Sequence, residues 1–182
     1  AQANARNPGF TVGGESLLSA TVTYSGSHYS TPATVTISGG SPLLQSVTPS
    51  VVATYSVVTA TPAGANGGTG FAIGDIVFLN TNPSITFTVS SISGSGLTGP
   101  ISSVTVTTNG GPLSTPISGV VNVTAITGSG TGASLTIVCG IYSLVVIDPG
   151  DGYNTVLPTI TITGSTASCL LYTSPSPRDV EE

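Results

Sequence analysis

Two carboxylates lie close together late in the chain, in the stretch DPGDG at residues 148–152. Paired carboxylates can serve as the acid and base of a glycosidase, and their oxygens are ligands that Ca²⁺ prefers. Asp148 and Asp151, however, are interleaved with proline and glycine, a setting in which an Asp side chain caps a turn. The stretch therefore predicts a turn, and Asp148 and Asp151 are only weak candidates for a metal site.

The chain has one histidine, His28, which lies beside Tyr29 in a glycine-containing stretch. A nucleophilic site needs a base held next to the nucleophile, and no nucleophile motif accompanies this histidine. GSGTG at residues 128–132 lacks the lysine of a phosphate-binding loop and precedes a predicted strand, so no helix N-terminus could hold an anion there. We expect no catalytic residue and no cofactor, and thus a protein that is not an enzyme.

Modification and thiol chemistry have one candidate each. Asn122-Val123-Thr124 is a sequon for N-linked sugar, so Asn122 is a candidate glycosylation site. The Thr-rich strands offer further hydroxyls for O-linked glycans, although threonine also simply suits the exposed face of a strand. Cys139 has apolar neighbours and is expected to be a small buried hydrophobic group.

The low charge and the short apolar runs exclude two classes of partner. Charged residues make up 5% of the 182-residue chain, and Arg6 and Arg178 are its only cations against seven carboxylates. Nucleic-acid affinity depends on neutralising phosphates, so no nucleic-acid partner is expected. Every apolar run is interrupted well before the roughly 20 residues that a membrane-spanning helix needs. Ser and Thr together number 55, and this neutral, hydroxyl-rich composition favours an extracellular location or a virion surface.

The elements that would position these residues are strands. Apolar residues alternate with Thr or Ser, as in TVTIS at residues 34–38 and TITIT at residues 159–163, which predicts strands with one buried face. Glycine-rich or proline-rich breaks at residues 64–70, 109–112 and 128–132 separate the strands. We predict an all-β fold, a β-sandwich or barrel-like units, with about 10 to 13 short strands. The other alternating stretches are residues 20–24, 85–89, 104–108 and 134–138.

Two phrases occur twice. GSHYSTPATVTISG at residues 26–39 matches GDGYNTVLPTITITG at residues 150–164 in its turn, tyrosine, proline and Thr-alternating strand, and GFTVG at residues 9–13 matches GFAIG at residues 70–74. Such repetition indicates two degenerate copies of one β unit. The expected packing anchors of the repeats are Tyr29, Tyr153, Phe10 and Phe71.

The repeats suggest a domain organisation. We predict an N-terminal extension at residues 1–15 that could donate a strand, a first β unit at residues 16–63 and a second at residues 64–168. Residues 169–179 (CLLYTSPSPRD) match the translation of a transposase-type sequencing adapter, so residues 169–182 are expected to be a non-native tail. The alternative is a genuine proline-containing tail, in which Cys169 could be a partner for Cys139.

The stretches at residues 26–40, 68–79, 104–138 and 145–164 resemble the glycine-rich β-repeats of tailed-bacteriophage structural proteins and related environmental surface filaments. This resemblance covers over half the chain and implies a role in a fibre, a tail or capsid appendage, or another surface filament. The chain departs from the pattern at His28, where glycine is usual, and at Gly111-Pro112, where Gly-Tyr or Ser-Tyr is usual.

These observations favour a structural subunit that self-assembles into an extracellular filament or a phage virion appendage. Uncharged strands can pack face to face or edge to edge against another copy without the cost of desolvating charges. The expected partner is therefore a homo-oligomer, with glycans as a further candidate. A carbohydrate-binding adhesin module is the alternative, for which exposed aromatic side chains would be needed.

Overall fold

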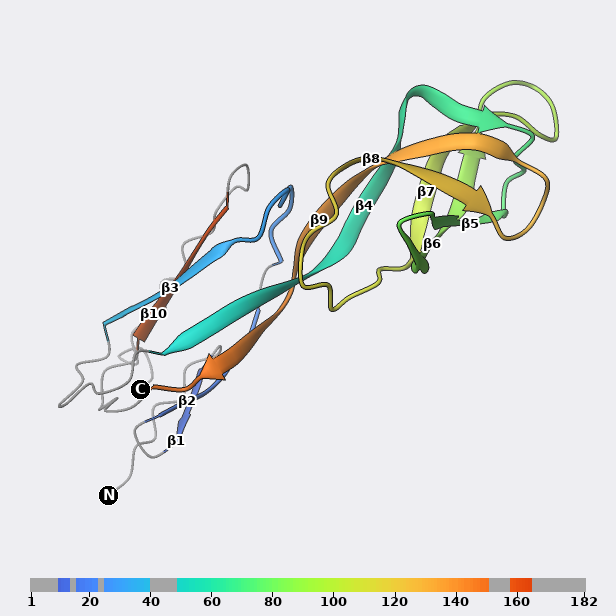
Figure 1. The fold of residues 1–182 in the computed structure, drawn as a ribbon. Coiled ribbons are helices and arrows are strands. Elements are labelled where there is room, and N and C mark those ends of the chain that lie inside the picture. The colour runs from blue at the N-terminus through green and yellow to red at the C-terminus, as the bar shows by residue number, and fades with distance from the viewer. Residues whose placement is uncertain (1–9, 14–15, 23–24, 40–48, 151–157, 165–182) are drawn as a thin grey trace, which may run out of the picture.

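The computed structural model describes residues 10–13, 16–22, 25–39, 49–150 and 158–164 (Figure 1). These residues form ten strands and no helix, which confirms the all-β prediction. Within these ranges there is accordingly no helix with the length and hydropathy to cross a membrane. The strands are β1 (Phe10–Gly13), β2 (Ser16–Ala20), β3 (Thr34–Gly39), β4 (Ser50–Thr69), β5 (Ile76–Leu79), β6 (Asn82–Ile92), β7 (Ile101–Thr108), β8 (Gly119–Ala125), β9 (Thr131–Asp148) and β10 (Pro158–Thr163).

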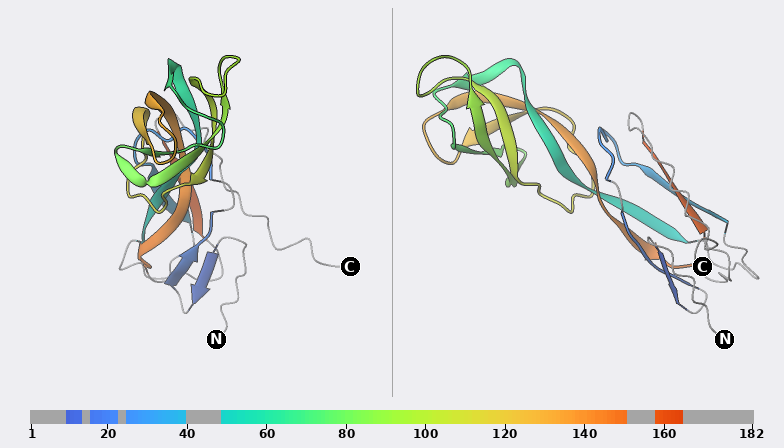
Figure 2. Two further views of the ribbon diagram at one scale, coloured as in Figure 1. Left: turned by 90° about the vertical axis from the view of Figure 1, so that its right-hand side faces the viewer. Right: turned by 180° about the vertical axis from the view of Figure 1, so that it is seen from behind.

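Six strands form one antiparallel sheet in the order β4-β9-β8-β5-β6-β7. This sheet curls into a nearly closed barrel, which brings its outer strands β4 and β7 near each other (Figure 2). Two isolated backbone bridges flank the seam between β4 and β7, one beyond each end of β7. Tyr55 and Leu113 exchange two bonds of 2.8 Å, and Phe71 and Gly99 exchange bonds of 3.1 and 2.8 Å.

The interior of the barrel follows directly from the alternating sequence. On β6, Ile85, Phe87 and Val89 are almost completely buried, whereas the two Thr residues between them point outward. Burying each such side chain contributes roughly 1.5–3 kcal/mol. The buried residues of the barrel core are Val57, Ala60, Phe71, Val77, Leu79, Ile85, Phe87, Val89, Ile101, Val121, Val123, Ala133, Leu135, Ile137 and Cys139.

Strands β4 and β9 are much longer than the sequence suggested, at 20 and 18 residues, and pair with each other along most of their length. The expected break at residues 64–70 was wrong, because residues 64–69 belong to β4. The register against β9 shifts between Pro62 and Gly67, and Gly64 has a φ of 59°. A Cβ on Gly67 would lie 2.4 Å from the carbonyl oxygen of Ile101. Here glycine permits a bulge and a close approach within a continuing strand.

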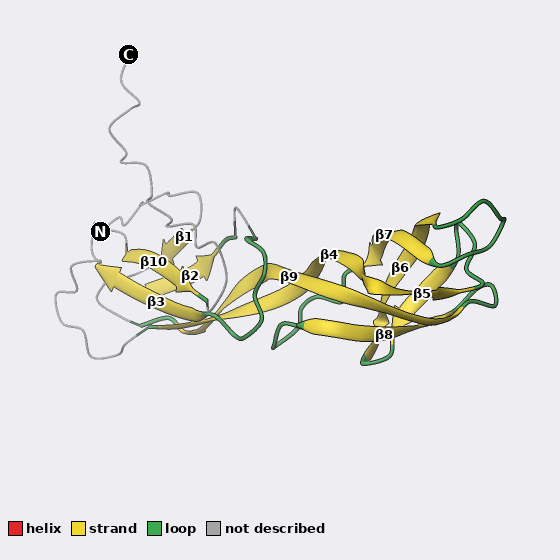
Figure 3. Cartoon of the chain, turned by 90° about the horizontal axis from the view of Figure 1, so that it is seen from above, coloured by secondary structure: helices red, strands yellow, loops and turns green. Residues whose placement is uncertain are grey.

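The half of the β4–β9 pair that extends beyond the barrel is the ribbon, formed by residues 50–56 and 140–148 (Figures 1 and 3). A two-stranded sheet of β3 and β10 covers one face of the ribbon. This second layer contributes four alternating apolar side chains to the contact, and the ribbon contributes Ala53, Tyr55, Ile141 and Leu144. The contributors from the layer are Val35, Ile37, Ile160 and Ile162.

The strands of the two similar stretches, residues 26–39 and 150–164, therefore pair with each other. β3 and β10 are antiparallel with six consecutive residue pairs and no register shift, so Val35 lies opposite Ile162 and Thr36 opposite Thr161. The predicted boundary between residues 63 and 64 lies inside β4. Strands β3 and β4, which begin in the predicted first unit, pair with β10 and β9 of the second.

The turn before β3 is fixed to the edge of β9. The Ile141 amide donates a 2.7 Å hydrogen bond to the Ser25 carbonyl, and the Tyr29 amide donates a 3.2 Å bond to the Cys139 carbonyl. Gly140 allows this approach, because a Cβ there would lie 2.6 Å from the carbonyl oxygen of Gly26. Backbone hydrogen bonds to β9 thus hold the turn at residues 25–29 in place.

The four expected packing anchors have different positions. Tyr29 is buried with its ring centroid 5.8 Å from that of Tyr55, and Phe71 is fully buried in the barrel. Phe10 begins β1, but its side chain lies outside the described part, as does all of Tyr153. The nearby strand β2 contributes the fully buried Leu17, which packs with Val51 of the ribbon.

Candidate functional surfaces

Asp148 holds a turn at the end of β9. Its Oδ1 accepts a 2.9 Å hydrogen bond from the backbone amide of Gly150, whose φ is 62°. Asp151, its proposed partner in a metal site, lies outside the described residues. Within the part of the chain that the structure describes, no three His, Cys, Asp or Glu side chains form a group that could hold a metal ion. The hydrogen bond between Asp148 and Gly150 is the one expected when an Asp side chain caps a turn.

His28 has an exposed side chain and an unusual backbone conformation. Its φ is 67°, a value that favours glycine, and its Nδ1 lies 2.9 Å from the Ser27 hydroxyl. Glycine adopts this conformation without strain, and glycine occupies the matching position, residue 152, in the second copy of the repeated sequence. The histidine thus replaces a turn glycine.

Two glycines of residues 128–132, Gly128 and Gly130, are required by packing. A Cβ on Gly128 would lie 2.3 Å from an Asp75 carboxylate oxygen, and one on Gly130 would lie 2.3 Å from the Phe71 ring. The Asp75 carboxylate also accepts a 2.9 Å hydrogen bond from the Ala72 amide. The loop therefore lies directly on a core aromatic ring and on a side chain that holds a turn.

Cys139 lies inside the barrel with no exposed surface. Burial raises the pKa of its thiol above the ordinary value of 9.0, and a backbone hydrogen bond at Ile117 offsets part of that effect. A thiol held in its neutral form is a poor nucleophile and a poor metal ligand. Cys139 therefore packs as a core side chain, and Cys169 lies outside the described residues.

Asn122 lies on β8 with its side chain exposed between the buried Val121 and Val123. Its backbone carbonyl accepts a 3.1 Å hydrogen bond from the Asn80 amide. The Thr124 hydroxyl of the same sequon donates a 2.8 Å bond to the Asn80 side chain. The position is accessible, and glycosylation of Asn122 stays a prediction.

Strands β6 and β7 share an outer face covered with hydroxyl groups, here called the paired hydroxyl face. Its Oγ atoms lie 2.6–2.8 Å apart in cross-strand pairs and therefore hydrogen-bond to each other. The Thr108 hydroxyl in addition donates to the Ser84 carbonyl at 2.6 Å. The pairs are Thr86 with Thr108, Thr88 with Thr107, Ser90 with Thr105, and Ser91 with Ser103.

A second hydroxyl-covered face lies on the side of β3 and β10 that points away from the ribbon, here called the open hydroxyl face. Its residues form three cross-strand pairs by register. Unlike on β6 and β7, no hydrogen bond links these side chains to one another or to any other described residue. The pairs are Thr34 with Thr163, Thr36 with Thr161, and Ser38 with Thr159.

The uncovered side of the ribbon, here called the ribbon face, is apolar. Val52 and Val145 are paired and are 45% and 41% exposed, and Ile147, two residues along, is 62% exposed. Beside them the hydroxyls of Thr54 and Ser143 bond to each other at 2.7 Å. Within the described residues only Asp75 and Asp148 are charged, so the exposed apolar side chains belong to an almost neutral surface.

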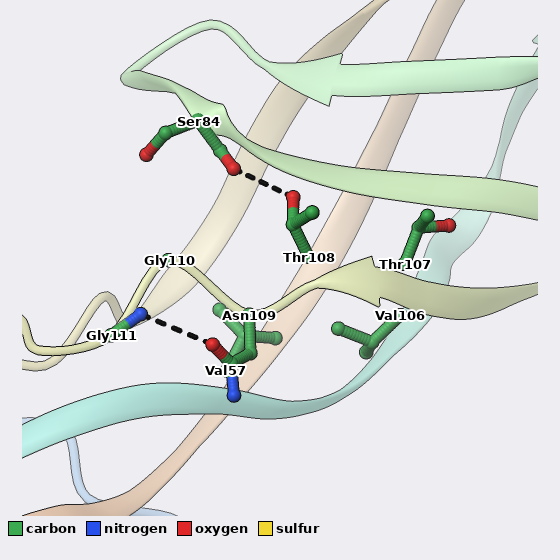
Figure 4. A pocket seen from close by; sticks show the side chains of 8 residues that line it. All are labelled: Val57, Ser84, Val106, Thr107, Thr108, Asn109, Gly110 and Gly111. Carbon is green, nitrogen blue, oxygen red and sulfur yellow. Dashed lines mark hydrogen bonds between the residues drawn. The ribbon is translucent and has the colours of Figure 1, made fainter.

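A groove opens where the barrel seam is incompletely paired, between β4 and the end of β7 (Figure 4). It has a volume of about 730 Å³ and no charged residue in its lining. Its wall is fixed by hydrogen bonds: the Val57 amide donates to the Asn109 carbonyl at 3.0 Å, and the Gly111 amide donates to Asn109 Oδ1 at 3.2 Å. The lining residues are Val57, Ser84, Val106, Thr107, Thr108, Asn109, Gly110 and Gly111.

Comparison of the chain with protein-family models, with curated proteins and with solved structures finds no match. The functional assignment therefore depends on the surfaces themselves.

Sequence reasoning missed both the ribbon face and the groove. A signal for the ribbon face was present, because LVVI at residues 144–147 does not alternate and so places apolar side chains on both sides of a strand. The groove had no such signal. It depends on the curl of the sheet, which brings residue 57 near residues 106–111.

Proposed function

We propose that this protein is a non-enzymatic structural subunit that assembles with copies of itself into an extracellular filament or a virion appendage. The observation that carries the proposal is the ribbon face, where Val52, Val145 and Ile147 are exposed, in a part of the chain whose only charged residues among those described are Asp75 and Asp148. Contact with a second copy would remove the exposed parts of these side chains from water, which contributes roughly 1 kcal/mol for each.

The two layers of this half give the contact a direction. One outer side is the ribbon face, and the opposite outer side is the open hydroxyl face, which includes Thr36 and Thr161. A contact between these two different surfaces is heterologous, so each added copy leaves a free ribbon face at one end and a free hydroxyl face at the other. Such a contact propagates and gives a filament, whereas contact of the ribbon face with itself would give a closed dimer.

The chemistry of the two surfaces suits this contact. Threonine presents a methyl group as well as a hydroxyl, so Val145 and Ile147 can pack against the methyl groups. The hydroxyls of the open face can bond across the strand pairs, as those of β6 and β7 do at 2.6–2.8 Å. No charge has to be desolvated on either surface, which removes the largest cost of burying a polar sheet face.

Sedimentation velocity over a range of protein concentrations, with negative-stain microscopy at the highest, tests the proposal. The expected result is concentration-dependent growth into linear particles with a regular repeat. A protein that stays monomeric at every concentration would contradict self-assembly. Particles that stop at a dimer would retain the ribbon face as a contact but contradict the heterologous arrangement.

A further inference from the structure

We propose that the seam groove is a binding site for a neutral saccharide of one or two pyranose rings. The lining residues of the groove include none of the ribbon face or the open hydroxyl face, although the ribbon begins directly beside the groove at Ser56 and Tyr142. Its volume of about 730 Å³ is in the range of small-ligand pockets, roughly 300–1,000 Å³.

The lining combines the two kinds of group that a sugar requires. Val106, which is partly exposed, supplies apolar surface for the C–H groups of a pyranose ring, whereas Val57 belongs to the barrel core and is only 3% exposed. Polar groups come from Asn109 and from the backbone of Gly110 and Gly111. Because Asn109 Oδ1 already accepts from the Gly111 amide, the orientation of the amide is fixed and its Nδ2 can donate to a sugar hydroxyl.

The site is held in place before any ligand arrives. The Asn109 carbonyl accepts a 3.0 Å hydrogen bond from the Val57 amide of β4. The Thr108 hydroxyl donates a 2.6 Å bond to the Ser84 carbonyl of β6 (Figure 4). Both walls of the groove are therefore tied to strands of the barrel. A preformed site avoids the entropic cost of ordering a loop on binding.

An exposed aromatic ring lies next to the groove. Tyr142 is 48% exposed, and a Cβ on Gly111 would lie 2.7 Å from its Cδ2, so the ring packs directly on the backbone of a lining residue. The electron-rich face of an aromatic ring attracts the weakly positive C–H groups of a sugar, and a half-exposed tyrosine keeps part of that face accessible. Glycine at position 111 is what allows the ring and the groove to be neighbours.

Charge selects among ligands. None of the lining residues is ionisable, so a phosphate or carboxylate ligand would lose its water without gaining a cation. A neutral saccharide forms hydrogen bonds with amide and backbone groups and carries no charge to desolvate. The groove therefore favours neutral hexoses and N-acetylhexosamines over uronic acids.

Saturation-transfer NMR on the intact protein tests this site. The probes are glucose, galactose, mannose, N-acetylglucosamine and their β-linked disaccharides, with glucuronic acid as the charged counterpart of glucose. We expect at least one neutral probe to bind with a Kd of roughly 1 mM or below, and glucuronic acid to bind more weakly than glucose. Absence of binding by every neutral probe, or preference for the acid, would overturn the proposal.

Variants locate the binding. Tyr142→Ala should weaken the binding of the neutral saccharide that binds the parent by at least about tenfold. Tyr142→Phe keeps the ring and should bind this saccharide within about twofold of the parent. Asn109→Ala should also bind more weakly. Tyr142 is half exposed, so its truncation leaves the core intact and decides the question even if Asn109→Ala fails to fold. Equal affinity in Tyr142→Ala and the parent would refute the site.

Discussion

The paired hydroxyl face of β6 and β7 and the open hydroxyl face of β3 and β10 come from the same Thr-alternating pattern but differ in their hydrogen bonding. On β6 and β7 the Oγ atoms bond across the strands, whereas none of the six side chains of the open face is bonded to another described side chain. The β6–β7 register shifts three times along its length, and the β3–β10 register does not shift. Bulges increase the local twist of a strand pair and change how its side chains meet.

This difference separates a surface that satisfies its own polar groups from one that leaves them for another molecule. The hydroxyls of β6 and β7 already have partners, so that face gains little from a protein contact. The regular, unbulged face of β3 and β10 presents Thr36 and Thr161 in register and unbonded to each other. We therefore propose that the open hydroxyl face of one copy contacts the ribbon face of the next.

The largest expected effect comes from placing a charge on each hydroxyl face in turn. Thr36→Asp puts a carboxylate in the proposed contact and should weaken self-association by at least about 100-fold, because the carboxylate would be desolvated without a partner. Thr88→Asp, at a partly exposed position of the paired face, is the matched control and should assemble normally. Sedimentation velocity measures the self-association of both variants. Equal association of the two would show that the faces do not differ in function.

A somewhat smaller effect is expected where the turn before β3 contacts the ribbon. Gly140→Ala forces a Cβ to within 2.6 Å of the Gly26 carbonyl oxygen, and the resulting displacement should lower the free energy of unfolding by about 1–3 kcal/mol. Urea denaturation followed by circular dichroism measures this change. Gly74→Ala is a useful control, because its Cβ would have open space around it and only the φ of 93° would cause strain. A smaller loss in Gly140→Ala than in Gly74→Ala would contradict the close contact.

The ribbon face should be more tolerant of a neutral change. Val145→Ser removes apolar surface at a position that is 41% exposed, and we expect association to weaken by roughly fivefold, or about 1 kcal/mol. Stability should hardly change, since the side chain is already partly in water. Stronger association in the serine variant would mean that the apolar surface is not part of the contact.

The smallest effect is expected on the paired face. The double variant Thr88→Val with Thr107→Val replaces both members of a hydroxyl pair that is bonded at 2.7 Å. Removing both partners leaves no unsatisfied group, so the free energy of unfolding should change by less than about 1 kcal/mol. Thermal unfolding of this variant beside the parent measures the change. A loss of several kcal/mol would show that the hydroxyl pairs stabilise the barrel.

The alternation in the sequence predicted much of the fold. TVTIS and TITIT lie in β3 and β10, and ITFTV lies in β6 with its apolar residues in the core. The pattern indicates which side of a strand is polar because side chains alternate between the two faces. It does not indicate which strands pair, so the pairing of the two similar phrases with each other was not foreseen.

Glycine was harder to interpret. The stretch at residues 64–69 contains three glycines and resembles a loop in sequence, yet it continues β4 because Gly64 and Gly68 adopt positive φ and Gly67 lies against another strand. The same ambiguity hid the groove, whose wall includes Gly110 and Gly111. A glycine signals freedom of the backbone, and only the fold decides whether that freedom serves a turn, a bulge or a close contact.

Thiol accessibility tests the central claim most directly. In a Cys169→Ser background, where Cys139 is buried, Val145→Cys and Thr36→Cys place reactive thiols on the two proposed contact surfaces, and Thr88→Cys places one on the paired face. We predict that alkylation at positions 145 and 36 slows by at least about tenfold on going from dilute to assembled protein, because a second copy covers them, whereas alkylation at position 88 stays constant. Alkylation rates that are the same in dilute and assembled protein at all three positions would contradict the account.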